Sequence, residues 1–139
     1  MDVNDTIRYI SGLTAKELRH MPEAVSRAGL RKIIRIILKE YGGEAPTWLY
    51  VGRRQDHVIV PKMYCTCKSF VIKVMAKKQR LSCKHLVAQW IAETNNTYRE
   101  LYITIREYMD IINEISRYGF SPTLRKLLYI KQKEKHGER

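Results

Sequence analysis

Apolar residues spaced three and four positions apart dominate both ends of the chain. One such pattern opens at Pro22, runs to Tyr41 and stops at Gly42-Gly43. Proline in the first turn and glycine past the last are usual helix ends, so the pattern predicts one long helix over 22–41. Its opposite face would carry a basic stripe at i, i+4 spacing, either a solvated face or a contact for nucleic acid or an acidic partner, made of Arg27, Arg31, Arg35 and Lys39. A shorter helix is predicted just before it, where Thr14 and Glu17 fit a capping box.

A second apolar stripe, rich in tyrosine and isoleucine, runs from Tyr98 to Ile115. It predicts a long helix over 97–118 that ends at Gly119, followed by a last helix from Leu124. The stripe has two interpretations: it closes the core, or it forms a surface for self-association or for a partner. Both interpretations remain open from the sequence.

The middle of the chain changes to strand patterns. Residues 47–51 and 57–60 are β-branched and aromatic, and residues 52–56 supply turn residues, which predicts a β-hairpin. A helix is predicted over 69–78, and another follows Ser82, a favourable N-cap, over 86–93. His57 is interpreted as a surface or interstrand histidine of the hairpin.

All three cysteines of the chain lie in this middle part, paired with a histidine as Cys65-Thr-Cys67 and Cys83-Lys-His85. Thiolates and imidazole are the ligands that zinc prefers, and structural zinc sites usually draw two ligand pairs from two turns. Alternatives are three buried core cysteines or a redox Cys-x-Cys, but the latter leaves Cys83 and His85 unexplained. An odd cysteine count argues against a disulfide framework. The spacing therefore predicts zinc bound by these four residues.

The same two motifs and the residues around them resemble a known family. Cys-x-Cys, fifteen intervening residues and Cys-x-His, with Tyr64 and Phe70 flanking the first pair, resemble the SWIM zinc finger, in particular the small Shu-complex SWIM proteins of homologous recombination. The resemblance covers roughly residues 47–95 and implies a β-hairpin followed by a helix. We expect an α+β fold, mostly helical, in which the zinc module 47–95 is flanked by helical segments 1–46 and 96–139.

The net charge of +12, from 26 basic and 14 acidic residues, favours a polyanionic partner. The finger contains no acidic residue between Cys65 and Ala92, and its cations are candidate phosphate contacts, although a solvated helix face explains them equally well: Lys68, Lys73, Lys77, Lys78, Arg80 and Lys84. Lys68 and Lys84 would also offset the negative charge of a three-thiolate zinc centre. Tyr64 or Phe70 is expected to pack beside the metal, with base stacking as the alternative.

Four ligands leave zinc no open position and no phosphate-binding loop is visible, so we expect no enzymatic activity and no catalytic residue. By resemblance, the chain would be an accessory protein of recombination and DNA repair that binds a RecA-like recombinase paralogue and DNA, with single-stranded DNA as one candidate. The alternative is a stand-alone DNA-binding transcriptional regulator with a structural zinc. No signal peptide or membrane-spanning run is visible, which predicts an intracellular protein, cytoplasmic or nucleoid-associated, or nuclear in a eukaryote.

Overall fold

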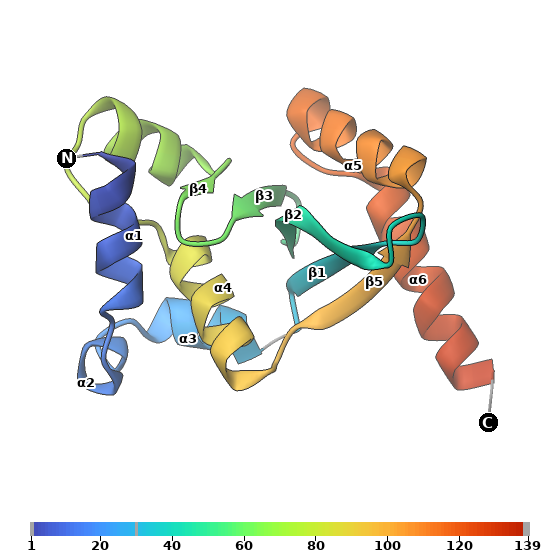
Figure 1. The fold of residues 1–139 in the computed structure, drawn as a ribbon, viewed down its shortest axis with the longest axis horizontal. Coiled ribbons are helices and arrows are strands. Elements are labelled where there is room, and N and C mark those ends of the chain that lie inside the picture. Colours follow the sequence, from blue (N-terminus) through green and yellow to red (C-terminus); the bar gives the residue numbers. More distant parts are fainter. Residues whose placement is uncertain (1, 30, 138–139) are drawn as a thin grey trace.

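The computed structural model describes residues 2–29 and 31–137, with side chains described up to Lys131. The chain has the predicted α+β fold (Figure 1). Its helices are α1 (Val3–Ser11), α2 (Ala15–Leu18), α3 (Pro22–Gly29), the π-helix η1 (Phe70–Ala76), α4 (Lys84–Asn95), α5 (Ile105–Tyr118) and α6 (Pro122–Gly137). Its strands are β1 (Ile33–Leu38), β2 (Gly43–Val51), β3 (Asp56–Val60), β4 (Tyr64–Cys65) and β5 (Arg99–Ile103).

The five strands form one sheet in the order β4-β3-β2-β1-β5. The predicted hairpin is confirmed as β2 and β3, which pair antiparallel with Tyr50 opposite His57. Strand β5 pairs parallel with β1, a connection that passes through the hairpin, the zinc module and α4. Strands from all three predicted segments therefore share one sheet.

Both faces of the sheet are covered, as Figure 1 shows. One core contains Ile33, Trp48 and Ile59 packed with α1, α3, α4 and η1. The other contains their strand neighbours Ile34 and Leu49, packed with α5 and α6. Alternation along each strand sends successive side chains to opposite cores, and in β1 every position except Arg35 is buried.

The predicted helix over 22–41 is wrong in its second half. Helix α3 ends at Gly29, and Ile33–Leu38 is strand β1, buried at every position except Arg35. Isoleucine is stiff at χ1 and fits a pleated surface, and a strand buried on both faces reads as a continuous apolar run. The predicted basic stripe therefore does not lie on one helix: Arg27 lies on α3, whereas Arg35 on β1 pairs with Glu44 and Glu100.

The predicted helix over 97–118 is also wrong at its start, because residues 99–103 form strand β5. Helix α5 begins only after Thr104, whose hydroxyl accepts from the Glu107 amide in a capping box. The residues of the predicted apolar stripe differ in exposure: Ile115 is buried in the core, whereas Met109 is 62% exposed. Self-association through residues 97–118 stays a prediction, now for a strand and a helix rather than one continuous helix.

Among the residues that the structure describes, no helix has both the length and the apolar character needed to cross a membrane.

Candidate metal centre

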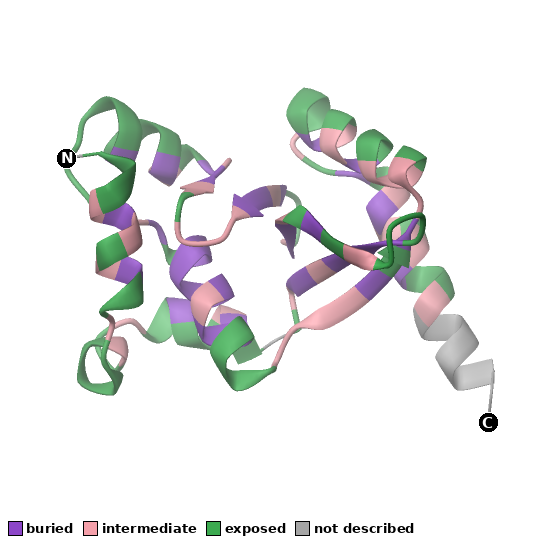
Figure 2. Cartoon of the chain, viewed as in Figure 1, coloured by how far each residue is buried: buried purple, intermediate pink, exposed green. Residues whose placement is uncertain are grey.

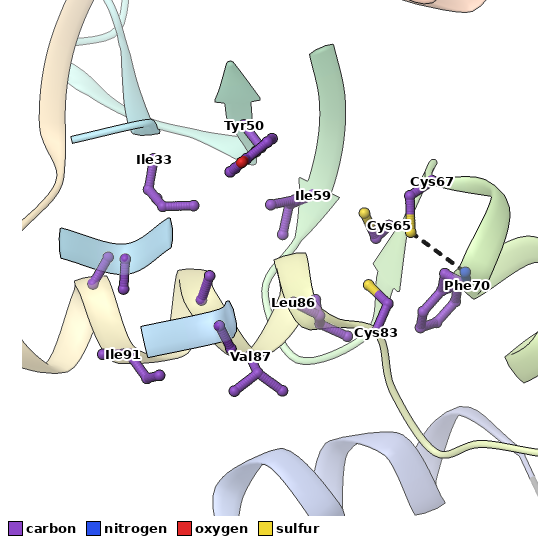
Figure 3. Close-up of a cluster of buried hydrophobic side chains, with 14 of the residues drawn as sticks. Ile33, Tyr50, Ile59, Cys65, Cys67, Phe70, Cys83, Leu86, Val87 and Ile91 are labelled. Carbon is purple, nitrogen blue, oxygen red and sulfur yellow. Dashed lines mark hydrogen bonds between the residues drawn. The ribbon is translucent and has the colours of Figure 1, made fainter. Parts of the chain in front are cut away.

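Four side chains converge at the end of the sheet beside α4. Cys65 ends β4, Cys67 follows it, Cys83 is the N-cap of α4, and His85 lies in the first turn of that helix. All four are buried, and their ligand atoms lie within 4.8 Å of one another. Figure 3 shows the three sulfur atoms turned toward a common space. The structure thus brings together all the metal ligands predicted from the sequence.

The first pair is positioned by strand pairing. Cys65 lies opposite Ile59 in the β3–β4 ladder. The residue between the cysteines, Thr66, is fixed to β3 twice: its amide donates to the Val58 carbonyl over 3.1 Å, and its hydroxyl accepts from the Val58 amide over 3.0 Å. Residues i and i+2 of an extended segment point to the same side, so both thiols face the same point.

The second pair is positioned by the start of a helix, but one residue later than predicted. Cys83, rather than Ser82, is the N-cap of α4, with extended backbone angles of φ −118° and ψ 166°. Its side chain makes no capping hydrogen bond. The sulfur is therefore free to bind a metal, while the backbone begins the helix that carries His85.

The donor set fits zinc. Nδ1 of His85 is buried and has no hydrogen-bond partner, which is costly for a polar atom unless it binds something else. A Zn–S distance of about 2.3 Å places the sulfurs of a tetrahedron about 3.8 Å apart, and the ligand atoms here lie within 4.8 Å of one another. Three cysteines and one histidine would hold the ion. The bound ion would then link the end of β4 to the start of α4. The described cysteines are free thiols rather than a disulfide.

The surroundings of the three thiols shift their pKa values in opposite directions. Hydrogen bonds from Cys65 and Cys83 hold the pKa of Cys67 far below its usual value, and the Phe70 amide also donates to its sulfur. The bond to Cys67 and burial raise the pKa of Cys65 far above its usual value, and that of Cys83 is raised to about 12. Thiols bind zinc as thiolates, so metal binding at this buried cluster has to release protons.

His57 lies beside the site. Its ring centroid is 4.5 Å from that of His85 and 6.0 Å from that of Tyr50. Burial lowers the pKa of His57 to about 4, with the neighbouring His85 adding to the effect. The interpretation as an interstrand histidine fits the pairing with Tyr50, but sequence reasoning missed the contact with the ligand. The position of His57 in the strand could have indicated this contact. His57 and Ile59 lie two residues apart and share one face of β3, and Ile59 lies opposite the ligand Cys65.

The six predicted phosphate contacts are all exposed: Lys68, Lys73, Lys77, Lys78, Arg80 and Lys84. Most of residues 68–80, the π-helix with its flanking residues, is exposed, as the colours of Figure 2 show. We name this segment the basic ridge. Lys84 lies 3.4 Å from Glu23 of α3. Lys73, Arg80 and Lys84 line an open hollow of about 810 Å³ between this ridge, α3 and α4. The ridge carries Lys77 and Lys78 beyond that hollow.

The two aromatics differ in exposure. Phe70 is 2% exposed and packs edge-to-face against Tyr64, with ring centroids 5.6 Å apart. Phe70 is therefore a core residue beside the metal centre, as expected, and has no face for a base. Tyr64 is half-buried.

Comparison with known proteins supports the same kind of site. The chain is 31% identical over 49 residues to the human protein "Zinc finger SWIM domain-containing protein 7", an alignment that covers 35% of this chain and 35% of that protein. It is 30% identical over 54 residues to the mouse protein of that name, covering 39% of this chain and 36% of that protein. The chain thus spans about a third of the length of these curated relatives. No family model matches the chain, and no solved structure matches it.

The similarity and the four clustered ligands confirm the resemblance to SWIM zinc fingers. The metal of this site is a structural zinc, because four buried protein ligands fill a tetrahedral shell.

Proposed function

We propose that this chain is a non-enzymatic accessory protein of homologous recombination that binds a RecA-like recombinase paralogue and DNA. The observation that carries the proposal is the closed Cys₃His centre, of SWIM type, beside an exposed ridge whose charged residues are all basic. A catalytic zinc keeps one coordination position for water, and this centre has four protein ligands. Zinc here orders a surface and takes no part in a reaction.

The ordered surface consists of three elements joined at the metal. Cys65 and Cys67 belong to the edge of the sheet, Cys83 and His85 to α4, and η1 is attached through the Phe70–Cys67 hydrogen bond. Zinc therefore sets how the π-helix stands against the sheet. This arrangement is what would give the ridge a fixed shape.

DNA binding is supported by the charge of that ridge. Lys68, Lys73, Lys77, Lys78 and Arg80 have no ion-pair partner among the side chains that the structure describes. Lysine and arginine that neutralise phosphates bind DNA without reading its sequence, and the affinity falls steeply with salt. The basic ridge would follow a phosphate backbone in this way.

Partner binding is supported by an apolar hollow of about 360 Å³ on the other side of η1. Its exposed lining includes Val3, Met63 and Met75, which are 44%, 41% and 52% exposed. Methionine-rich concave surfaces adapt to apolar partner side chains. In this proposal the recombinase paralogue contacts this hollow, and the finger presents both it and the basic ridge.

A pull-down from nuclease-treated native extract tests the proposal, with bound proteins identified by mass spectrometry. The tagged baits are the wild type, Cys83→Ser and the matched surface variant Lys77→Glu/Lys78→Glu. We expect a RecA-like ATPase with the wild type and with the lysine variant, which keeps its zinc, and its loss with Cys83→Ser.

Absence of any RecA-like protein from all three baits would contradict the recombination role. Sequence-specific binding to a palindromic duplex in the same extracts would instead favour the transcriptional regulator, because dimeric readers impose two-fold spacing on their sites.

A further inference from the structure

A second basic cluster lies away from the finger, where β1 and β5 begin and β2 ends, beside α6. It lines an open hollow of about 470 Å³. Ile34 and Leu128 contribute apolar lining, no acidic residue lines the hollow, and the four cations around it are Arg31, Lys32, Arg53 and Arg99. None of the six finger cations lines this hollow.

The sheet register brings these cations together from distant parts of the chain. Arg99 lies beside Ile34 in the parallel β1–β5 ladder. The Val51 amide donates to the Lys32 carbonyl over 2.9 Å, which joins the end of β2 to the start of β1. Arg53 follows in the turn after β2.

That turn is rigid. The Gly52 amide donates to the Gln55 carbonyl over 2.9 Å, and Nη2 of Arg125 donates to the Gly52 carbonyl over 3.0 Å. A Cβ at position 52 would stand 2.3 Å from the Gln55 carbonyl oxygen, so only glycine fits. The backbone that presents Arg53 is therefore fixed against α6.

No side chain that the structure describes neutralises the four cations. Elsewhere on the same sheet Arg35 pairs with Glu44 and Glu100. Among the side chains that the structure describes, no carboxylate pairs with any of the four. Burial lowers the pKa of Arg99, and the charge of Arg31 adds to the effect. Like charges held this close repel one another and cost stability.

The backbone at Arg31 adds a second cost. Its φ of 57° lies in the left-handed region, which is unfavourable for arginine. Strained backbone in proteins gathers at ligand clamps and binding sites, where bound ligand offsets its cost. Charge repulsion and strain thus coincide at one hollow.

We propose that this hollow is a binding site for phosphate groups. Guanidinium groups present forked donors that match phosphate oxygens in paired hydrogen bonds, and three of the four cations are arginines. A phosphate would remove the repulsion that the described side chains leave uncompensated. The source of the phosphate is either a nucleic-acid backbone, in which case the inference rests on the proposed DNA binding, or a free polyphosphate compound.

The test uses the full chain and a fluorescently labelled oligothymidylate, with binding followed by anisotropy across a sodium chloride titration. The variant Arg53→Gln/Arg99→Gln removes two cations of the hollow, and Arg31→Asn removes a third with a residue that tolerates the left-handed backbone. The control Lys16→Gln/Arg19→Gln makes the same charge change at exposed residues of and beside α2. For nucleic acid as the source, we expect the hollow variant to lower the salt slope by about 1.4, at about 0.7 for each single-strand phosphate contact.

A structural role is distinguished by the thermal unfolding midpoint. Removing mutually repelling cations should leave that midpoint unchanged or raise it while affinity falls. A lower midpoint in Arg53→Gln/Arg99→Gln and in Arg31→Asn alike would show instead that these side chains stabilise the fold, which overturns the proposal.

The second arm titrates ¹⁵N-labelled protein with pyrophosphate and follows the amides of Gly52, Arg53 and Arg99. Saturable shifts in the wild type that vanish in the hollow variant support the site even if the oligonucleotide does not bind, an outcome that would sink only the proposed DNA binding. If the salt slope for the oligonucleotide changes in the hollow variant but pyrophosphate causes no amide shifts, the site is assigned to nucleic acid. An unchanged slope together with no pyrophosphate shifts overturns the inference and leaves the proposed function standing if the finger lysines still bind.

Discussion

The backbone N–H of Phe70 donates a hydrogen bond to Sγ of Cys67 over 3.4 Å, at the point where the π-helix leaves the metal centre. The Val71 amide donates to the Cys67 carbonyl over 3.1 Å, so Cys67 joins η1 through both its sulfur and its backbone. The sulfur of Cys67 thus accepts a hydrogen bond from the first turn of the helix that carries Lys73. Loss of zinc should therefore disturb the basic ridge as well as the ligands themselves.

The first prediction concerns the metal. Cys83→Ser should lose zinc, because a serine hydroxyl is a poor ligand compared with a thiolate. The free energy of unfolding should fall by several kcal/mol, since zinc binding contributes about 10–16 kcal/mol in isolated zinc-finger peptides and only part of this fold depends on it. Elemental analysis and urea unfolding measure the two effects.

The control for this variant is Ser82→Ala, which removes a hydroxyl that donates to the Cys83 carbonyl but leaves all four ligand side chains in place. It should keep zinc, and a chelator added to the wild type should reproduce the stability of Cys83→Ser. Unchanged zinc content in Cys83→Ser would rule out the assigned ligand set.

The metal centre could be predicted from sequence because its signal is local. Cys65 and Cys67 lie two residues apart on a strand end, Cys83 and His85 two apart at a helix start, and few residue types bind zinc. Contacts set by strand register carry no such local signal. His57 lies against His85, and Arg53 lines the same hollow as Arg99, only once the strands of the sheet have paired.

The two missed strands have a common physical cause. Ile33 and Ile34 are both fully buried because helices cover both faces of β1. Alternation disappears in such a strand, and an apolar run matches a helical template as well as a strand template. Strand β5 was missed because Tyr98 and Leu101 happen to continue the spacing of the true helix α5.

The second prediction concerns the ridge. Lys77→Glu/Lys78→Glu should keep zinc, since both side chains are exposed and lie away from the ligands. Affinity for an oligothymidylate should fall at low salt, and the salt slope should become shallower by about 0.7 for each phosphate contact removed. Anisotropy across a salt titration measures both quantities. Lys16→Glu/Arg19→Glu is the charge-matched control, and equal losses in the two variants would point to net charge rather than to the ridge.

The third prediction concerns the buried carboxylate of Asp56, whose side chain is fully buried. Nη2 and Nε of Arg125 donate to it over 2.7 and 3.2 Å, and the Ser121 amide donates over 2.8 Å. Arg125→Met would leave a buried charge without its partner, at a cost of about 3–5 kcal/mol. Asp56→Asn leaves Arg125, which is 35% exposed, able to turn to water, and should cost only about 1–3 kcal/mol.

Urea unfolding at neutral pH, followed by circular dichroism, ranks the two variants. The predicted order of stability follows from burial, because Asp56 is fully buried and costs more free energy than Arg125 when its partner is removed. An Asp56→Asn variant that is less stable than Arg125→Met would contradict this account of the pair.

The last prediction concerns pH and the start of α6. Glu114 accepts hydrogen bonds from the Ser121 and Thr123 hydroxyls, each over 2.7 Å, and from the Thr123 amide over 3.0 Å. Desolvation raises the pKa of Glu114, but these hydrogen bonds outweigh it and hold the pKa below the ordinary value of 4.5. The folded state therefore binds the proton more weakly than the unfolded state, so the carboxylate stabilises the fold above pH 4.5, and this contribution is lost as pH falls through the folded pKa.

Glu114→Gln should be less stable than the wild type at neutral pH, and the difference in unfolding free energy should shrink as pH falls below about 4.5. Comparing the two proteins at each pH cancels acid effects at the zinc centre, which both share, and a difference that stays constant down to the acid transition would show that Glu114 acts through packing rather than through its charge.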